Sequence, residues 1–191
     1  MSRDTDPGGV TPPATGSQTI GPFFHFGPGS HLELGQMAPE SVSGERLQLT
    51  FRVLDGTGLP VPDALVEIWQ PDNSGQYPDR VPGAAPRGFP GFGRLPTDEA
   101  GMCTFETLRP GRCSPREAAH VNVCMLMRGL LRHVYTRVYF EGDPDLATDQ
   151  VLALVPEDRR YTLVASPAAA VGAWTFEIHM QGDRETVFFD L

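Results

Sequence analysis

The sequence predicts a mainly β protein, an antiparallel β-sandwich with one or two short helices. The 191 residues include 21 glycines and 19 prolines, a composition that favours many turns and short strands over long helices. Several short segments alternate between apolar and polar side chains, which is the period of a half-buried strand. The rest of the chain contains one segment with the pattern of a helix longer than two turns, so strands dominate the expected fold.

The strands are separated by turn signals. Residues 47–54 alternate apolar and polar side chains and end in the turn sequence Asp-Gly-Thr-Gly at 55–58. By the same criteria, further strands are expected at 62–70, 102–108, 121–127, 134–140, 174–180 and 185–189.

Loops and one helix connect these strands. Residues 78–96 are dominated by Pro, Gly, Arg and Phe and are expected to form a loop, and 97–101 form a turn that leads into the strand 102–108 as a hairpin. Pro156 stands at a favourable first helical position, followed by two acidic residues that suit the positive end of a helix. A helix is therefore expected from there to Ala165.

The length fits one domain. Residues 1–16 are rich in Gly, Pro, Ser and Thr and are expected to form a flexible N-terminal tail. Residues 17–46 form an arm and loops that carry Phe23 and Phe24, and aromatic side chains in such a segment indicate docking on a partner. Residues 47–191 form the β-sandwich domain.

The charge pattern excludes several functions. The chain has 15 cationic and 24 acidic residues, a net charge of −9, and every cation is arginine because the sequence contains no lysine. Schiff-base and other lysine chemistry is therefore impossible. The acidic balance disfavours nucleic acids and anionic membranes as partners, since both attract cationic proteins.

The cysteines and the N-terminal residues predict a cytoplasmic protein. Three cysteines are an odd number without a Cys-x-x-Cys pair, which is typical of reduced thiols rather than of disulfides or structural zinc. No apolar segment has membrane-spanning length, and the first residues lack the apolar core of a secretory signal.

Simple catalytic motifs give little support for a function. His31 and Glu33 form the His-x-Glu half of a possible Fe(II) site, but they lie in a loop-like segment, and a solvated turn is the preferred interpretation. The sequence contains neither a Gly-x-Ser-x-Gly elbow nor a glycine-rich phosphate loop.

A more specific set of motifs is spread along the chain. It comprises Val-Pro-Asp-Ala-Leu-Val-Glu-Ile-Trp-Gln-Pro-Asp-Asn-Ser-Gly-Gln-Tyr at 61–77, Phe-Gly-Arg at 92–94, Thr-Asp at 97–98, Gly101, Arg-Pro-Gly at 109–111 and Ala-His-Val-Asn at 119–122. Together these motifs resemble those of the intradiol aromatic-ring dioxygenases, and the resemblance extends over about residues 17–191. It implies the β-sandwich of that family.

The resemblance also implies a metal site with missing ligands. The family holds a ferric ion with two tyrosines and two histidines, and phenolate oxygen suits a hard trivalent metal. Tyr77 matches the first tyrosine and His120 the first histidine, whereas Cys113 and Asn122 stand at the other two positions. This implies that the chain binds no iron. An improvised Cys/His/Tyr site for a softer metal is the competing interpretation; hydrogen-bonded structural roles for Tyr77 and His120 are preferred.

Loss of the ligands resembles the non-iron alpha subunit of the heteromeric members of the family. The Ser-Gln-Thr-x-Gly-Pro sequence at 17–22, the His-x-Asn strand and the tail at 185–190 support this resemblance. It implies a beta subunit of the same fold that carries Fe(III).

The same resemblance implies a substrate and a set of residues that bind it. The substrate is protocatechuate (3,4-dihydroxybenzoate), which O2 cleaves between its two hydroxylated carbons to 3-carboxy-cis,cis-muconate. Thr19, Gly21 and Pro22 line the pocket at the interface between the subunits, and Arg128 offers positive charge to the substrate carboxylate.

Two other functions remain open from the sequence. One is a non-enzymatic, transthyretin-like β-sandwich binding module that uses the same strands as a scaffold. The other is a self-sufficient catechol dioxygenase with an altered metal site.

Overall fold

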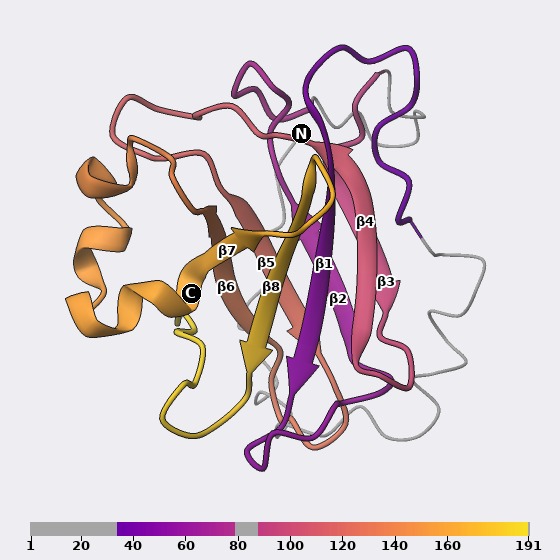
Figure 1. Cartoon of the computed structure of the whole chain (residues 1–191), viewed down its shortest axis with the longest axis vertical. Coiled ribbons are helices and arrows are strands. Elements are labelled where there is room, and N and C mark those ends of the chain that lie inside the picture. Colours follow the sequence, from indigo (N-terminus) through magenta and orange to yellow (C-terminus); the bar gives the residue numbers. More distant parts are fainter. Residues whose placement is uncertain (1–33, 79–87, 191) are drawn as a thin grey trace, which may run out of the picture.

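Eight strands form the framework of the molecule (Figure 1). A computed structural model describes residues 34–78 and 88–190. The strands are β1 (Arg46–Leu54), β2 (Leu65–Trp69), β3 (Phe92–Pro96), β4 (Met102–Leu108), β5 (Val121–Leu126), β6 (Val134–Phe140), β7 (Val164–Pro167) and β8 (Ala173–His179). Three short 3-10 helices, η3 (Leu146–Thr148), η4 (Leu152–Leu154) and η5 (Glu157–Leu163), lie between β6 and β7. The described helices are too short to cross a bilayer.

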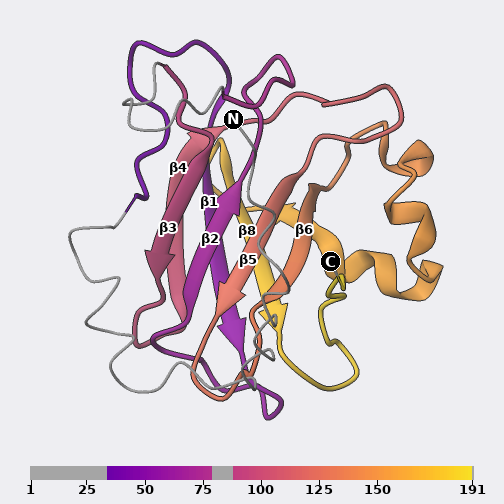
Figure 2. The same cartoon turned by 180° about the vertical axis from the view of Figure 1, so that it is seen from behind.

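The strands form two layers that are joined along one side. The order β3-β2-β5-β6-β7-β8-β1-β4 is continuous, and the pairing of β6 with β7 connects the two halves. In Figure 1 the layer containing β8, β1 and β4 faces the viewer, and Figure 2 shows the layer containing β2, β5 and β6 from the other side. This arrangement confirms the mainly β sandwich expected from the sequence.

The core lies between these layers. Alternation along β1 buries one side of the strand, as expected for residues 47–54. Phe51 packs edge-on against Phe105 of β4 and Phe176 of β8, with ring centroids 5.7 and 5.9 Å apart. Apolar side chains from β2, β5 and β6 complete the core, including Ile68, Val123 and Val138. Full burial of each such side chain contributes about 1.5–3 kcal/mol.

A buried glutamine connects the two layers at the end of β2. The Gln70 side chain is fully buried; its amide nitrogen donates to the Leu108 carbonyl over 2.9 Å, and its carbonyl accepts from the Thr107 hydroxyl over 2.9 Å. Both partners lie at the end of β4. The polar residue that ends the Glu-Ile-Trp-Gln motif is therefore a structural tie between the layers.

The strand pairings are mixed rather than purely antiparallel. Five of the seven pairings are antiparallel, whereas β1 with β8 and β6 with β7 are parallel. Alternation within a strand fixes which face is buried but carries no information about the direction of its neighbour. The pairing of β1 with β8 joins the first and last strands, whereas β6 and β7 are consecutive strands connected through the three 3-10 helices.

The prediction of a hairpin at 97–101 is wrong, because the strands on either side of the turn do not pair with each other. The turn exists, and Asp98 accepts hydrogen bonds from the backbone N–H groups of Ala100 and Met102. However, β3 pairs with β2 and β4 pairs with β1, so the turn carries the chain from one layer to the other. β3 itself lies within residues 78–96, which were expected to be loop, because Gly93 and Pro96 conceal its short pattern.

Two expectations near the C-terminus also need correction. The expected helix to Ala165 is a 3-10 helix that ends at Leu163, after which β7 begins and pairs with Tyr139 of β6. Residues 185–189 do not form a strand; Phe189 makes one isolated bridge with Tyr135. In both places, pairing with distant strands outweighs the local pattern.

Candidate functional site

Tyr77 follows a tight loop that begins where β2 ends. One carboxylate oxygen of Asp72 accepts hydrogen bonds from the backbone N–H groups of Ser74 and Gln76 and from the Ser74 hydroxyl. Such side-chain to backbone bonds are typical of Asp in turns. The loop therefore holds Tyr77 at a defined place at this end of the sandwich.

Two glycines allow this loop to pack against the loop that follows β4. Gly75 has a φ of 84°, and a Cβ there would lie 1.9 Å from the carbonyl oxygen of Arg112. A Cβ at Gly111 would lie 2.5 Å from the Gly75 nitrogen. Because both positions are glycine and lack a side chain, the two backbones can approach closely. This approach brings Cys113 beside Tyr77.

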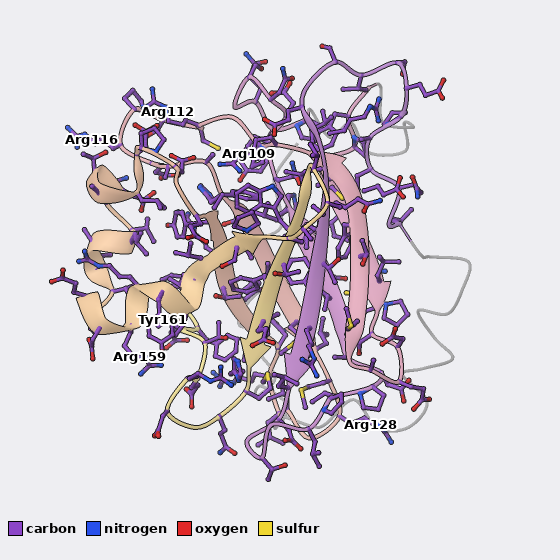
Figure 3. All side chains as sticks on the ribbon, viewed as in Figure 1. Arg109, Arg112, Arg116, Arg128, Arg159 and Tyr161 are labelled. Carbon is purple, nitrogen blue, oxygen red and sulfur yellow. The ribbon has the colours of Figure 1, made fainter. Side chains whose placement is uncertain are left out.

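Arginines hold the second loop against the rest of the sandwich. The guanidinium of Arg109 lies 4.0 Å from the ring centroid of Phe140 and 3.4 Å from the Asp143 carboxylate. Arg112 pairs with Asp145 over 2.9 Å. Figure 3 shows Arg109, Arg112 and Arg116 at one end of the molecule. The loop is thereby anchored to β6 and to the segment after it.

Three of the four expected metal-site positions are hydrogen-bonded to one another. The side-chain amide nitrogen of Asn122 donates to the Tyr77 hydroxyl oxygen over 2.8 Å. A further hydrogen bond joins the Tyr77 and Cys113 side chains. The structure therefore brings Tyr77, Cys113 and Asn122 together; we call them and His120 the degenerate cluster.

His120 stands at the buried start of β5. Its side chain is 2% exposed, and its Nδ1 lies 2.9 Å from the Ala118 carbonyl oxygen. Since a carbonyl only accepts, Nδ1 carries the proton and Nε2 has the lone pair. Nε2 lies 3.9 Å from a carboxylate oxygen of Glu117. The backbone N–H of Ala118 donates to buried Asp149 over 2.8 Å, which fixes this turn.

The side chains of the degenerate cluster are uncharged at neutral pH. Partial burial of Tyr77, which is 41% exposed, and the nearby Cys113 raise the tyrosine pKa to about 12. Burial also raises the pKa of the Cys113 thiol. Burial and the positive charge of Arg137 lower the pKa of His120. The four positions therefore carry a phenol, a thiol, an amide and a neutral imidazole.

Arg137 is a member of this neighbourhood that sequence reasoning missed. It lies on β6 directly opposite Asn122 in the register of the sheet, with Tyr135 and Tyr139 on the same face of its strand. Its Nη1 lies 3.8 Å from the Glu117 carboxylate. The alternation at 134–140 indicates which face of the strand carries Arg137. Only the pairing of β5 with β6 shows that Arg137 lies opposite Asn122.

Arg128 lies far from the degenerate cluster. It comes six positions after Asn122, beyond the end of β5 at Leu126, a span of up to about 20 Å at 3.3 Å per residue. Figure 3 shows Arg128 at the end of the molecule opposite Arg109 and Arg112. Its side chain is 60% exposed and lies 3.4 Å from the Asp63 carboxylate. The structure therefore does not bring Arg128 and the degenerate cluster together.

Several expected site residues cannot be placed. Thr19, Gly21 and Pro22 lie outside the described residues, as do His31 and Glu33. Within residues 34–78 and 88–190, no group of three or more His, Cys, Asp and Glu side chains has the arrangement of a metal site.

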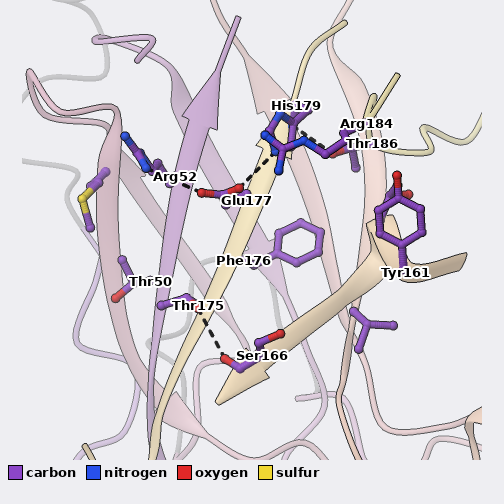
Figure 4. Close-up of a pocket in the computed structure, with 13 residues that line it drawn as sticks. Thr50, Arg52, Tyr161, Ser166, Thr175, Phe176, Glu177, His179, Arg184 and Thr186 are labelled. Atoms are coloured by element: carbon purple, nitrogen blue, oxygen red, sulfur yellow. Dashed lines mark hydrogen bonds and ion pairs between the residues drawn. The ribbon is translucent and has the colours of Figure 1, made fainter. Parts of the chain in front are cut away.

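Two pockets lie on the outer faces of the layers. The larger, about 490 Å³, lies between the outer face of β1 and β8 and the helix η5 (Figure 4). At its centre Glu177 lies 3.1 Å from His179 Nε2 and 3.6 Å from Arg52. The other, about 290 Å³, is lined by residues of β2, β3, β5 and β6 with His133. Neither pocket is lined by an expected site residue.

Comparison with known proteins agrees with the motifs and the fold. A family model described as Dioxygenase matches residues 20–182. The chain belongs to the intradiol dioxygenase family. Members of this family are oxidoreductases that depend on iron, and the match confirms the family expected from the motifs at 61–77 and 119–122.

Relatives within the intradiol dioxygenases are similar to different extents. The chain is 41% identical to a protocatechuate 3,4-dioxygenase alpha chain of Burkholderia cepacia, over 93% of this chain and 97% of the relative. It is 31% identical to a beta chain of the same species, over 80% of this chain and 67% of the relative. An intradiol ring-cleavage dioxygenase structure from Tetranychus urticae has a TM-score of 0.63 at 21% identity, covering 81% of this chain and 91% of that one. At this low identity, the similarity of the two structures shows a shared fold and nothing about activity.

Proposed function

We propose that this chain is the alpha, non-iron subunit of an enzyme that cleaves protocatechuate with O2 to 3-carboxy-cis,cis-muconate. One observation carries the proposal: the degenerate cluster has Cys113 and Asn122 where the family has metal ligands, and Arg137 lies beside them. Similarity over nearly the full length of an alpha chain, and lower similarity to a beta chain, supports the same assignment.

The residues of the degenerate cluster do not fit a ferric ion. Ferric iron favours anionic oxygen ligands, whereas Cys113 presents a sulfur and Asn122 an uncharged amide that directs its N–H at the Tyr77 oxygen. The guanidinium of Arg137 adds a positive charge, which repels a cation. Only His120 has a free donor atom suited to a metal. The proposal therefore places the catalytic iron on a partner subunit of the same fold.

The contribution of this chain is to shape and charge a pocket at the interface with that partner. Protocatechuate carries a carboxylate besides its two hydroxyl groups, and burial of an anion requires a cation or hydrogen-bond donors. Arg128 is exposed and lies up to about 20 Å from Asn122 in the degenerate cluster of its own chain, so it suits a pocket completed by another subunit.

The N-terminal residues have a proposed role in the same pocket. The arm at 17–46 docks on the partner, where Thr19, Gly21 and Pro22 form part of the wall, while 1–16 remain a flexible tail and 47–191 form the sandwich domain. Aromatic residues in the arm support docking. Reduced thiols at all three cysteines suit a cytoplasmic assembly.

The decisive experiment is expression of the chain alone and together with an iron-bearing beta subunit. Iron content, visible absorbance and turnover of protocatechuate are measured for each preparation. We expect the chain alone to be iron-free, colourless and inactive, and the co-expressed complex to be coloured and active. Turnover of catechols by the chain alone would instead favour a self-sufficient dioxygenase. Failure to form any complex would favour a plain binding module.

A further inference from the structure

The charged groups at the degenerate cluster form a compact arrangement. Arg137 has a side chain that is 21% exposed, and its Nη1 atom is buried. Glu117, whose side chain is 19% exposed, lies 3.8 Å from that nitrogen and 3.9 Å from His120 Nε2. One carboxylate oxygen therefore lies within 4 Å of both the guanidinium and the imidazole.

Sheet register places the guanidinium among the remaining members of the cluster. Arg137 and Asn122 are directly opposite on β6 and β5, where side chains on one face approach to about 4.5–5.5 Å between Cβ atoms. Asn122 in turn contacts the Tyr77 hydroxyl over 2.8 Å. Arg137 is thus the cation that borders the side chains at the positions of the family's metal ligands.

One nitrogen of the guanidinium is held here by charge rather than by a hydrogen bond. Within the described part of the chain, Nη1 of Arg137 has no hydrogen-bond partner although it is buried. A buried N–H without a partner is unfavourable by about 1–3 kcal/mol. Attraction to the Glu117 carboxylate offsets that cost in a partly desolvated site.

We propose that Arg137 is the resident cation of the degenerate cluster, paired with Glu117, and that its charge excludes a metal ion even when the missing ligands are restored. The inference rests on the proposed function, because it explains how a member of an iron-dependent family remains free of iron. The exclusion of a metal ion then depends on Arg137 of β6 as well as on the residues at positions 113 and 122.

The test restores the ligands with and without the arginine. The double variant Cys113→Tyr/Asn122→His is compared with the triple variant that adds Arg137→Gln, and ferric iron is supplied to both as its citrate complex. Bound iron per chain is measured after removal of free metal. We expect the triple variant to bind ferric iron at least tenfold more tightly than the double variant. Equal binding by the two variants, with both folded, would refute the role of Arg137.

A matched control separates charge at this position from charge on the sheet in general. Arg94 of β3 pairs with Glu67 of β2 over 2.7 Å on the same layer, and both side chains are mostly buried. Adding Arg94→Gln to the double variant is expected to leave iron binding unchanged. If it increases binding as much as Arg137→Gln does, the effect is one of net charge and the proposal is wrong.

A second measurement keeps the proposal testable if a restored variant fails to fold. Arg137→Gln, Glu117→Gln and the combination of both are compared by denaturant unfolding in the otherwise unchanged chain. We expect each single change to lower the unfolding midpoint, and the second change to cause little further loss, because the unpaired charge is removed. Strictly additive losses would mean that the two side chains are not a pair. The iron content of the unchanged chain decides the proposed function separately.

Discussion

At the residue scale, the side chains at one end of the sandwich carry the proposed function. At the positions that the family resemblance assigns to metal ligands, Cys113 and Asn122 present an uncharged thiol and an amide, while Tyr77 and His120 match the family. The retained pair now serves structure, since Tyr77 accepts from Asn122 and His120 donates to the Ala118 carbonyl. These side chains therefore differ from the family pattern on a backbone that keeps the family's fold.

At the same scale, Arg128 gives a prediction about substrate recognition. In the complex with the beta subunit, Arg128→Gln should lower kcat/KM for protocatechuate about 10- to 100-fold, mainly through KM, since a charge-assisted hydrogen bond contributes about 1.5–3 kcal/mol. Unsubstituted catechol lacks the carboxylate and should be nearly unaffected. Steady-state kinetics with both substrates measures the difference.

Arg112 provides the control for this substitution. It is an exposed arginine at the opposite end of the molecule and pairs with Asp145 over 2.9 Å. Arg112→Gln should leave the ratio of the two kcat/KM values unchanged. Equal losses for both substrates in Arg128→Gln would remove that residue from carboxylate recognition.

At the scale of elements, two loops create the degenerate cluster by touching through their backbones. The loop after β2 and the loop after β4 meet where Gly75 and Gly111 leave no room for side chains. Bonds from Asp72 shape the first loop, and Arg109 and Arg112 anchor the second. The position of Cys113 beside Tyr77 thus depends on Gly75 and Gly111, which let the two loops approach.

Substitution of Gly75 should be costly for that reason. A side chain at φ 84° is strained by about 1–2 kcal/mol, and the clash with the Arg112 carbonyl oxygen adds about 1–3 kcal/mol. Gly75→Ala should therefore lower the free energy of unfolding by about 2–5 kcal/mol, measured by denaturant titration.

Gly58 isolates the conformational part of this loss. Its φ is 81°, yet a Cβ there would meet nothing within 4 Å. Gly58→Ala should cost only about 1–2 kcal/mol. If the two variants are equally stable, close packing of the two loops does not contribute to stability.

At the scale of the whole molecule, the two sets of proposed functional residues lie at opposite ends of the sandwich. The degenerate cluster occupies one end, and Arg128 occupies the other (Figure 3). The layers between them are held by the continuous core and by the Gln70 tie. This separation suits a subunit whose own metal-site position is silent and whose opposite end meets a partner.

Deletions of the N-terminal residues test the proposed arm in the assembly. Removal of residues 1–16 should leave complex formation and turnover unchanged. Removal of residues 1–33 should lower kcat/KM for protocatechuate by at least tenfold or prevent assembly, since it removes the proposed pocket wall and docking residues. Size-exclusion chromatography and kinetics of the co-expressed complexes give both readouts.

Circular dichroism of each deletion variant serves as the control. Both variants keep the residues from 34 onward, which include the described core with Met37, so the spectrum of the folded domain should persist in both. Full activity in the shorter variant would show that residues 17–33 are not needed for the pocket.

Much of the fold was predictable because half-buried strands have a visible period. β1, β4, β5, β6 and β8 lie within one residue of the segments expected from alternation. β3 and β7 were not expected, since they are only five and four residues long and contain glycine or proline. The 3-10 helix η5 was expected as a longer helix, because local sequence signals do not show that β7 begins at Val164 and ends the helix.

The sequence by itself determined the buried faces of most strands and the absence of lysine chemistry, since both depend on residue type and local spacing, whereas the proposed ligand positions came from a family resemblance. The tertiary structure alone decided that two parallel pairings close the sandwich, that Arg137 faces Asn122, and that Arg128 lies at the other end. The physical reason is that these relations arise from strand register and layer crossing, which depend on contacts between distant segments.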